Sequence, residues 1–431
     1  MEALTSYHLI IIFSITIIIS YFFNLYAKKS GVPAVLLLIG LGIIINYSLR
    51  IAGFGKPDLL PILGVLGVVG LILIVLEAAL DLELVKSKIG LIIKSFFIAL
   101  IGLGITAYLS ALALGFFMET DILTALLCTI PLSILGSAVI LPSVDDVETE
   151  KREFVIYEST FSDILGIVAF YTVLTIANSN ESVSISVFSN LLFTVIFSVI
   201  ISYVLIYVFQ NIKGHVKLFL LIAVLLLLYA VGKMFHLSSL IIILIFGIML
   251  NNYKVFFKGN LMRLLNEDKV NSVLYDMRVI TAETAFVVRT FFFIIFGWSV
   301  FLGLLLNLNV LLMGLVVLVI IYLVRVIILF LFNGKDILFE LFLAPRGLVT
   351  ILLFFAIPEE LSLGKEFQGV LLFVVLASCL IMAWALISYK NKSSQTEAIV
   401  IEDEVLGVEN EELDIEEKEE EEEGPEDVDP V

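Results

Sequence analysis

The sequence predicts an all-α, multi-pass membrane protein of about 13 transmembrane helices, built as two inverted six-helix repeats. Its apolar content, its series of long apolar segments and two matching helix interruptions support this prediction. Of the 431 residues, 61% are apolar and 16% are charged, whereas soluble domains average about 45–50% and about 25%. A soluble protein of this composition would expose large apolar patches, so the expected solvent is a lipid bilayer.

The charge is concentrated at the C-terminus. The segment 393–431 holds 18 acidic residues and a single base, Lys418, so it accounts for the whole net charge of −17. Its high charge and few large apolar residues predict a disordered, acidic cytoplasmic tail. The membrane domain, 1–392, is therefore neutral overall.

Thirteen segments are long and apolar enough to span a bilayer, which takes about 20 residues per helix. They divide into repeat one (about 7–177), a linker helix (187–211) and repeat two (about 216–389). The predicted spans are 7–26, 31–48, 60–80, 90–117, 122–143, 152–177, 187–211, 216–234, 237–252, 280–305, 307–332, 337–358 and 366–389.

Basic residues orient these spans. With the N-terminus outside, 17 Lys and Arg residues near span ends are cytoplasmic and four are external. Basic residues favour the cytoplasmic side, so the sequence predicts a cell (inner) membrane protein with its C-terminus in the cytoplasm. The mixed stretch 253–279 is then cytoplasmic, either as an interfacial amphipathic helix or as a loop.

Two spans in corresponding positions carry helix-breaking residues at mid-membrane. The fifth contains Pro131, Gly136 and Pro142, and the twelfth contains Pro345 and Gly347. Broken helices at matching positions of two repeats are typical of the substrate sites of secondary transporters. One such helix alone is more often a structural kink.

Four charged residues lie deep in apolar spans, where a charge costs about 2.5–3.5 kcal/mol on insertion scales. Five residues separate Glu158 from Asp163, which places them about 140° apart around a helix, so they are not expected to act as one pair. Glu158 is the expected buried partner of Arg325. Arg346 is expected to offset the dipole ends of the second broken helix.

Asp163 is the expected ion-binding carboxylate. Burial favours the uncharged form of a carboxylate, so such a group holds either a proton or a cation, and competition between the two is exchange. Monovalent hard cations prefer oxygen ligands. The hydroxyl groups of Ser162, Ser137 and Ser133 are expected to complete the site.

Three further charges have no assigned role. Glu77 lies in the third span, and Glu283 and Arg289 lie in the tenth. Snorkelling at helix ends explains these residues as well as function does. Glu283 and Arg289 are too far apart around a helix for a direct pair.

Four segments resemble motifs of the monovalent cation:proton antiporter superfamily, the sodium/proton exchangers, and the resemblance runs from about residue 10 to 389. They occur in the family's order: Gly31–Gly40 in the second span, Glu158–Asp163 in the sixth, Thr290–Gly297 in the tenth, and Pro345–Gly347 in the twelfth.

The resemblance implies a homodimer in which a core domain moves against a dimerisation domain. It assigns ion binding to Asp163, a stabilising salt bridge to Glu158 and Arg325, and a position near the site to Arg346. Having one carboxylate at the site, and Arg at position 325, resembles the electroneutral branch, with one cation exchanged per proton.

Two departures from the family leave the ion open. Ser162 replaces the usual asparagine, and Gly136–Ala138 resembles the triplet of potassium-efflux relatives. The expected cargo is Na⁺, or Li⁺ or K⁺, together with H⁺; neither a cofactor nor a nucleic acid partner is expected. A K⁺/H⁺ antiporter is the alternative. A cation channel fits the broken helices less well, and an intramembrane enzyme would need a motif such as HExxH or GxSxG, which the sequence lacks.

Overall fold

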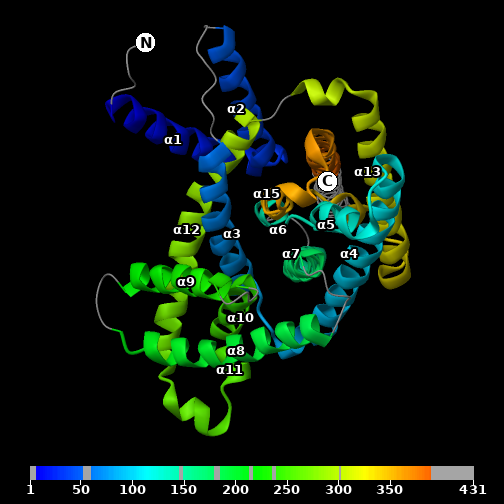
Figure 1. The fold of residues 1–431 in the computed structure, drawn as a ribbon. Coiled ribbons are helices and arrows are strands. Elements are labelled where there is room, and N and C mark those ends of the chain that lie inside the picture. Colours follow the sequence, from blue (N-terminus) through cyan, green and yellow to red (C-terminus); the bar gives the residue numbers. More distant parts are fainter. Residues whose placement is uncertain are drawn as a thin grey trace, which may run out of the picture.

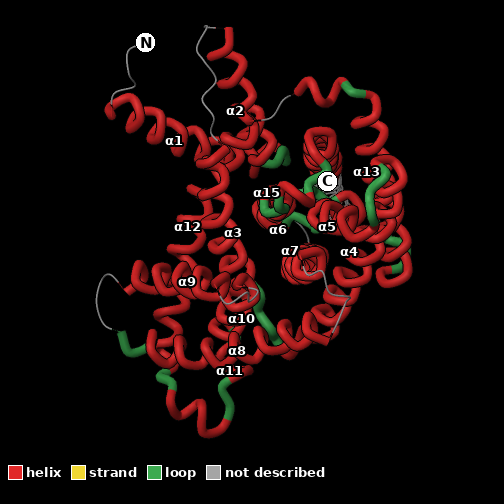
Figure 2. The backbone as a smooth tube through the Cα atoms, in the orientation of Figure 1, coloured by secondary structure: helices red, strands yellow, loops and turns green. Residues whose placement is uncertain are grey.

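The computed structural model describes the chain in seven segments, which are helical throughout apart from short connections (Figures 1 and 2). The predicted acidic tail and the boundary between the eighth and ninth spans lie outside the described residues. The described segments are 6–51, 60–144, 149–178, 185–212, 217–234, 239–299 and 302–389.

Each of the 13 predicted spans has a helical counterpart. Nine described helices are long and apolar enough to cross a membrane by length and composition. The helices are α1 (Ser6–Ser30), α2 (Ala34–Ile51), α3 (Leu60–Asp81), α4 (Ile89–Met118), α5 (Ile122–Ser133), α6 (Ser137–Ile140), α7 (Thr149–Asn178), α8 (Ile185–Phe209), α9 (Lys217–Met234), α10 (Ser239–Asn251), α11 (Tyr253–Phe256), α12 (Glu267–Ser299), α13 (Leu308–Asn333), α14 (Leu338–Phe342), α15 (Leu348–Phe355) and a last helix, Gly364–Tyr389. Five 3₁₀ turns join them: η1 (Lys86–Lys88), η2 (Leu141–Ser143), η3 (Gly259–Leu264), η4 (Leu302–Leu306) and η5 (Glu359–Leu361).

The helix that corresponds to the predicted tenth span, 280–305, extends beyond the start of that span. Helix α12 begins 13 residues earlier, at Glu267, and ends at Ser299. Asn266 caps its start by accepting a hydrogen bond of 3.1 Å from the Lys269 amide. The first turns pack their apolar side chains into the protein even though their outer face is charged. The stretch 253–279 is therefore neither one interfacial helix nor a loop, because it holds α11, η3 and the start of α12.

The helices pack as two groups (Figure 1). The scaffold group contains α1, α2, α3, α8, α9, α10 and α12; α12 packs against α2 and α3, and α10 packs against α3, α8 and α9. The core group contains α4 to α7 and α13 to α15, with α4 packed against α5, α7 and α13. The last helix joins the core group: the Phe367 ring lies tilted against that of Phe354 on α15, with ring centroids 5.7 Å apart. Each half of the chain thus contributes helices to both groups.

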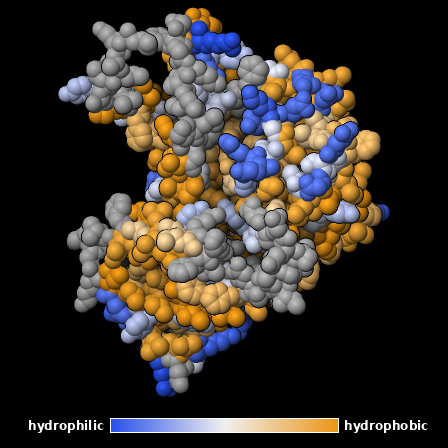
Figure 3. Space-filling model, in the orientation of Figure 1, coloured by the Kyte–Doolittle hydropathy of each residue, from blue (hydrophilic) through white to orange (hydrophobic). Residues whose placement is uncertain are grey.

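Apolar residues predominate among the coloured residues on the face of the molecule seen in Figure 3. Long apolar side chains are highly exposed on helices of both groups, for example Ile44 on α2, Phe116 on α4 and Leu331 on α13. In a membrane protein such a surface contacts lipid acyl chains.

Candidate ion-binding site

The two interrupted helices meet in the middle of the core group. The fifth span is split between α5 and α6, and the twelfth is split between α14 and α15, with loops at both breaks (Figure 2). The Gly136 amide of the first break donates a hydrogen bond of 2.9 Å to the Pro345 carbonyl of the second. Freed backbone groups within a membrane must be satisfied by protein or by a water-filled cavity, and here the two breaks partly satisfy each other.

Asp163 lies on α7 directly beside this crossing. Its carboxylate oxygen Oδ2 accepts hydrogen bonds from the hydroxyl and from the amide of Ser137, the latter at 3.3 Å. Its second oxygen, Oδ1, is buried without a hydrogen-bond partner among the described residues. Only 2% of Asp163 is exposed. A buried acceptor without a donor requires an explanation, and an ion, a proton or a water molecule bound to Oδ1 would provide one.

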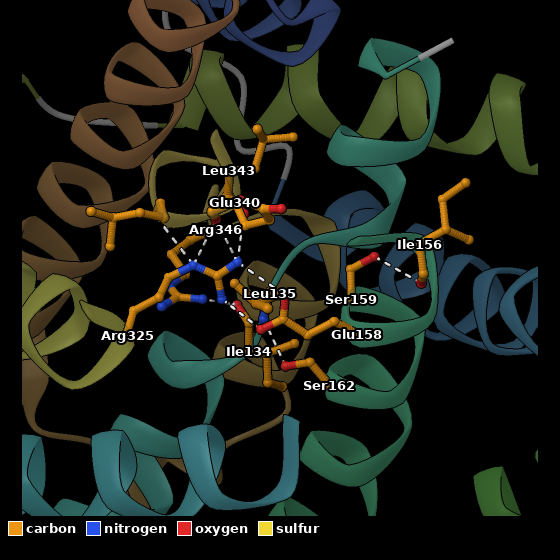
Figure 4. A network of polar contacts seen from close by, with 11 residues as sticks. Ile134, Leu135, Ile156, Glu158, Ser159, Ser162, Arg325, Glu340, Leu343 and Arg346 are labelled. Carbon is orange, nitrogen blue, oxygen red and sulfur yellow. Dashed lines mark hydrogen bonds and ion pairs between the residues drawn. The ribbon is translucent and has the colours of Figure 1, made fainter. Parts of the chain in front are cut away.

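Glu158 of α7 and Arg325 of α13 form a bidentate ion pair (Figure 4). The two N–O distances are 2.7 and 3.0 Å, although 167 positions separate the residues in sequence. The guanidinium also donates to the carbonyl groups of Glu340, Leu341 and Leu343, at the C-terminal end of α14. Parallel N–H···O bonds of this kind fix both partners in place.

Arg346 donates a hydrogen bond to the end of α5, the first half-helix of the fifth span. Its Nη1 donates a hydrogen bond of 2.7 Å to the Ile134 carbonyl, which terminates α5 (Figure 4). Its own amide is held by the Ser378 hydroxyl at 2.9 Å. Carbonyl groups at helix C-termini carry partial negative charge. Each buried arginine therefore donates to the carbonyl end of one interrupted half-helix: Arg346 to the end of α5, in the first broken helix and not in the second as expected, and Arg325 to the end of α14.

The three candidate serines do not gather around Asp163. Ser137 contacts it directly, whereas Ser162 accepts a hydrogen bond of 2.9 Å from the Leu135 amide. Ser133 donates to the Thr129 carbonyl of its own helix, at 2.9 Å. Ser133 and Ser162 instead line a cavity of about 30 Å³ beside Glu158 and Arg325, which is space for about one water molecule.

A much larger cavity, of about 340 Å³, lies on the Ser137 side. Its walls come from α6 and η2 of the core group and from α1, α2, α3 and α12 of the scaffold group. The break thus separates two environments: the large cavity reaches Ser137, and the small one reaches Ser133 and Ser162.

Two features of this region were not expected from the sequence. Arg289 on α12 pairs with Glu77 on α3, at 3.3 Å, and both side chains line the large cavity. Glu340 is 4% exposed, and its Oε2 has no hydrogen-bond partner among the described residues. A search for acidic residues next to the predicted second break would have found Glu340, but its burial depends on packing.

A polytopic helical bundle whose two broken helices cross beside a buried carboxylate has the architecture of a secondary transporter. The family profile described as "Sodium/hydrogen exchanger, transmembrane" matches residues 12–387. The chain belongs to this family of cation:proton antiporters and is not an enzyme.

The fold is similar to two structures of the sodium proton antiporter MjNhaP1 from Methanocaldococcus jannaschii. For the structure at pH 8, the TM-score is 0.65 and the identity is 20%, over 88% of this chain and 95% of the other. For an electron-microscopy structure, the TM-score is 0.66 and the identity is 18%, over 90% of this chain and 97% of the other. A comparison with curated protein sequences gave no match.

Proposed function

We propose that this protein exchanges a monovalent cation, in the first place Na⁺, for a proton by alternating access, and that Asp163 binds the two in competition. The observation that carries this proposal is the asymmetry of the Asp163 carboxylate. Ser137 holds Oδ2, while Oδ1 is buried without a described partner, and the larger cavity reaches Ser137.

The chemistry follows from that carboxylate. Oδ1 offers a lone pair either to a proton or to a hard cation, which prefers oxygen ligands. The Ser137 hydroxyl donates to Asp163 now, but a hydroxyl also carries two acceptor lone pairs. Its oxygen can therefore turn toward a cation once its hydrogen points elsewhere. Proton and cation neutralise the same negative charge, so one carboxylate does not retain both.

Exchange of one cation per proton fits this arrangement. Whether Asp163 holds a proton or a monovalent cation, the loaded core group carries the same charge. Movement of the two loaded forms in opposite directions then transfers no net charge. In proteoliposomes, the exchange rate should be independent of an imposed membrane potential, and a rate that follows the potential would contradict this stoichiometry.

Ser162 and Ser133 take a different role in this proposal from that of Ser137. Together with Glu158, Arg325 and Arg346 they support the crossing from the side away from the larger cavity. They would contact the ion only in a conformation that opens that side. K⁺ remains the alternative cargo, because Gly136–Ala138 resembles the triplet of potassium-efflux relatives.

The membrane arrangement is part of the same proposal. The protein lies in the inner membrane as a homodimer, with its N-terminus outside and its C-terminal tail in the cytoplasm. The two six-helix repeats are related by inversion, the scaffold group forms the dimer contacts, and the core group moves against it. In this orientation α3 ends on the cytoplasmic side. Asp81, the last residue of α3, lies at the wall of the larger cavity, so that cavity opens toward the cytoplasm.

Proton efflux from proteoliposomes tests the proposal directly. The rate should rise and saturate with Na⁺ and Li⁺, or with K⁺ if the alternative holds, and Asp163→Asn should abolish it at every concentration. Asp163→Asn keeps the size of the side chain, so its melting temperature checks the fold. Cation-dependent exchange that survives in a folded Asp163→Asn protein would refute the role of this residue.

A further inference from the structure

The larger cavity contains a second set of charges that the Asp163 site does not use. Glu77 and Asp81 stand four residues apart on α3 and line the cavity together, opposite the helix α6 that carries Ser137. Residues at this spacing share one helix face. Arg289 of α12 lines the same cavity. Arg289 contacts Glu77 and acts electrostatically on both carboxylates, while Asp81 interacts more strongly with Arg278 than with Arg289.

The Glu77–Arg289 pair differs in kind from the Glu158–Arg325 pair. It has a single N–O contact of 3.3 Å, and its side chains are 20% and 23% exposed. The Glu158–Arg325 pair has two contacts, of 2.7 and 3.0 Å, and its side chains are 2% and 8% exposed. An ion pair that water reaches is weak, whereas a buried bidentate pair is held rigidly. The Glu77–Arg289 contact is therefore looser and more accessible to dissolved cations than the Glu158–Arg325 pair.

We propose that Arg289 is a tethered counter-cation that competes with the transported cation for the carboxylates of Glu77 and Asp81, and thereby sets the apparent cation affinity from this side. The inference rests on the proposed function, in which the cation reaches Asp163 through the larger cavity. Arg289 is an affinity-determining residue, and its contribution to the transport step itself is indirect.

The physical reason is the local concentration of ions. Two carboxylates on a partly enclosed wall attract monovalent cations, and the Arg289 guanidinium cancels part of that attraction while it remains bound to Glu77. Cavities lined with one sign of charge raise the local concentration of the opposite ion. Removal of the guanidinium should therefore lower the cation concentration that is needed for half-maximal exchange.

Kinetics of Arg289 variants in proteoliposomes test this. Arg289→Gln should lower the apparent KM for Na⁺ about three- to tenfold, which corresponds to the loss of one partly screened unit charge near the path. Arg289→Lys keeps the charge and should have a KM close to that of the parent. The effect of Arg289→Gln should shrink as impermeant salt is added, because the interaction is screened. A residue that only supports the fold would not produce this ionic-strength dependence.

Glu77→Gln provides the reciprocal measurement, because it removes the ion-pair partner of Arg289 and leaves Asp81 as the acidic residue of α3 at the cavity wall. It should raise the apparent KM severalfold, and Glu77→Gln combined with Arg289→Gln should return it toward the parent value. If Arg289→Gln does not fold, the KM values of Glu77→Gln and Arg289→Lys still decide whether Arg289 sets the apparent cation affinity. An unchanged or raised KM for folded Arg289→Gln, or an unchanged or lowered KM for Glu77→Gln, would overturn the inference.

Asp163→Asn, assayed in parallel, separates the two proposals. Lost exchange in Asp163→Asn with an unaltered KM in Arg289→Gln leaves the proposed function intact and removes only the role of Arg289. Retained exchange in Asp163→Asn removes the proposed function itself.

Discussion

Gly136 and Gly347 lie in contact at the point where the two interrupted helices cross. A Cβ atom added to Gly136 would lie 2.9 Å from the Cα of Gly347, and the neighbouring Gly136–Pro345 hydrogen bond ties the two breaks together at 2.9 Å. The two glycines come from opposite halves of the chain. Their approach brings the ends of both broken helices within reach of the buried arginines and of Asp163.

Gly136→Ala should destabilise the protein because its Cβ would meet the backbone of Gly347, which has no flexible side chain to move aside. Overpacking of this kind costs about 1–3 kcal/mol. Thermal unfolding in detergent measures the effect. Gly104→Ala on α4 is the matched control, since no atom lies within 4 Å of its added Cβ. Equal melting temperatures for the two variants would show that the crossing tolerates a wider separation.

Glu158→Gln should be among the most destabilising single substitutions in the core group. It leaves the Arg325 guanidinium buried without its anion, and breaking a buried pair costs about 3–5 kcal/mol. Unfolding of the purified protein measures the loss. Lys254→Gln breaks the solvent-exposed pair with Glu267, at 3.0 Å, and should leave the melting temperature unchanged. A similarly small shift for Glu158→Gln would mean that the carbonyl groups of α14 suffice to hold Arg325.

Ser137→Ala should weaken cation binding more than Ser133→Ala does. The Ser137 hydroxyl contacts Asp163, while that of Ser133 is directed to the Thr129 carbonyl of its own helix. Loss of one oxygen contact of about 1–1.5 kcal/mol corresponds to roughly a tenfold rise in KM. Cation titration of proton efflux measures both variants. A larger KM change for Ser133→Ala would place the ion on the other side of the break.

Asp121 caps α5 and should make the start of that helix sensitive to acid. Backbone hydrogen bonds from Thr124 and Leu123 to its carboxylate, at 2.9 and 3.1 Å, hold the pKa of Asp121 below its ordinary value. The ionised cap therefore contributes its full stability above the unfolded pKa of about 3.9, and that contribution is lost as the pH falls through the lower folded pKa.

Asp121→Asn retains an acceptor at this position and has no charge to lose. Between pH 6 and pH 3, its melting temperature should fall less than that of the parent, while Asp121→Ala should be less stable than both at pH 6, by about 0.5–2 kcal/mol. If the melting temperatures of Asp121→Asn and of the parent fell in parallel with pH, ionisation of the Asp121 carboxylate would not stabilise the folded state.

The membrane class, the thirteen segments and the positions of both breaks could be predicted from the sequence, because each depends on local properties. Transfer of a segment of about 20 residues into lipid is favourable or unfavourable according to its own side chains, and Pro131, Gly136, Pro345 and Gly347 interrupt backbone hydrogen bonding where they stand. The pairing of Glu158 with Arg325 could also be anticipated, since a buried charge needs a counter-charge and few are at membrane depth.

The direction of each polar side chain around the crossing, in contrast, is set by contacts between segments far apart in the chain. Ser133, Ser137 and Ser162 are equivalent as residue types, yet packing directs only Ser137 to Asp163. The partner of Glu77 is 212 positions away, and the early start of α12 depends on neighbours that bury its first turns. Hydropathy and residue spacing determine whether a segment forms a helix within the membrane. Which side chains contact each other depends on the packing of the two helix groups.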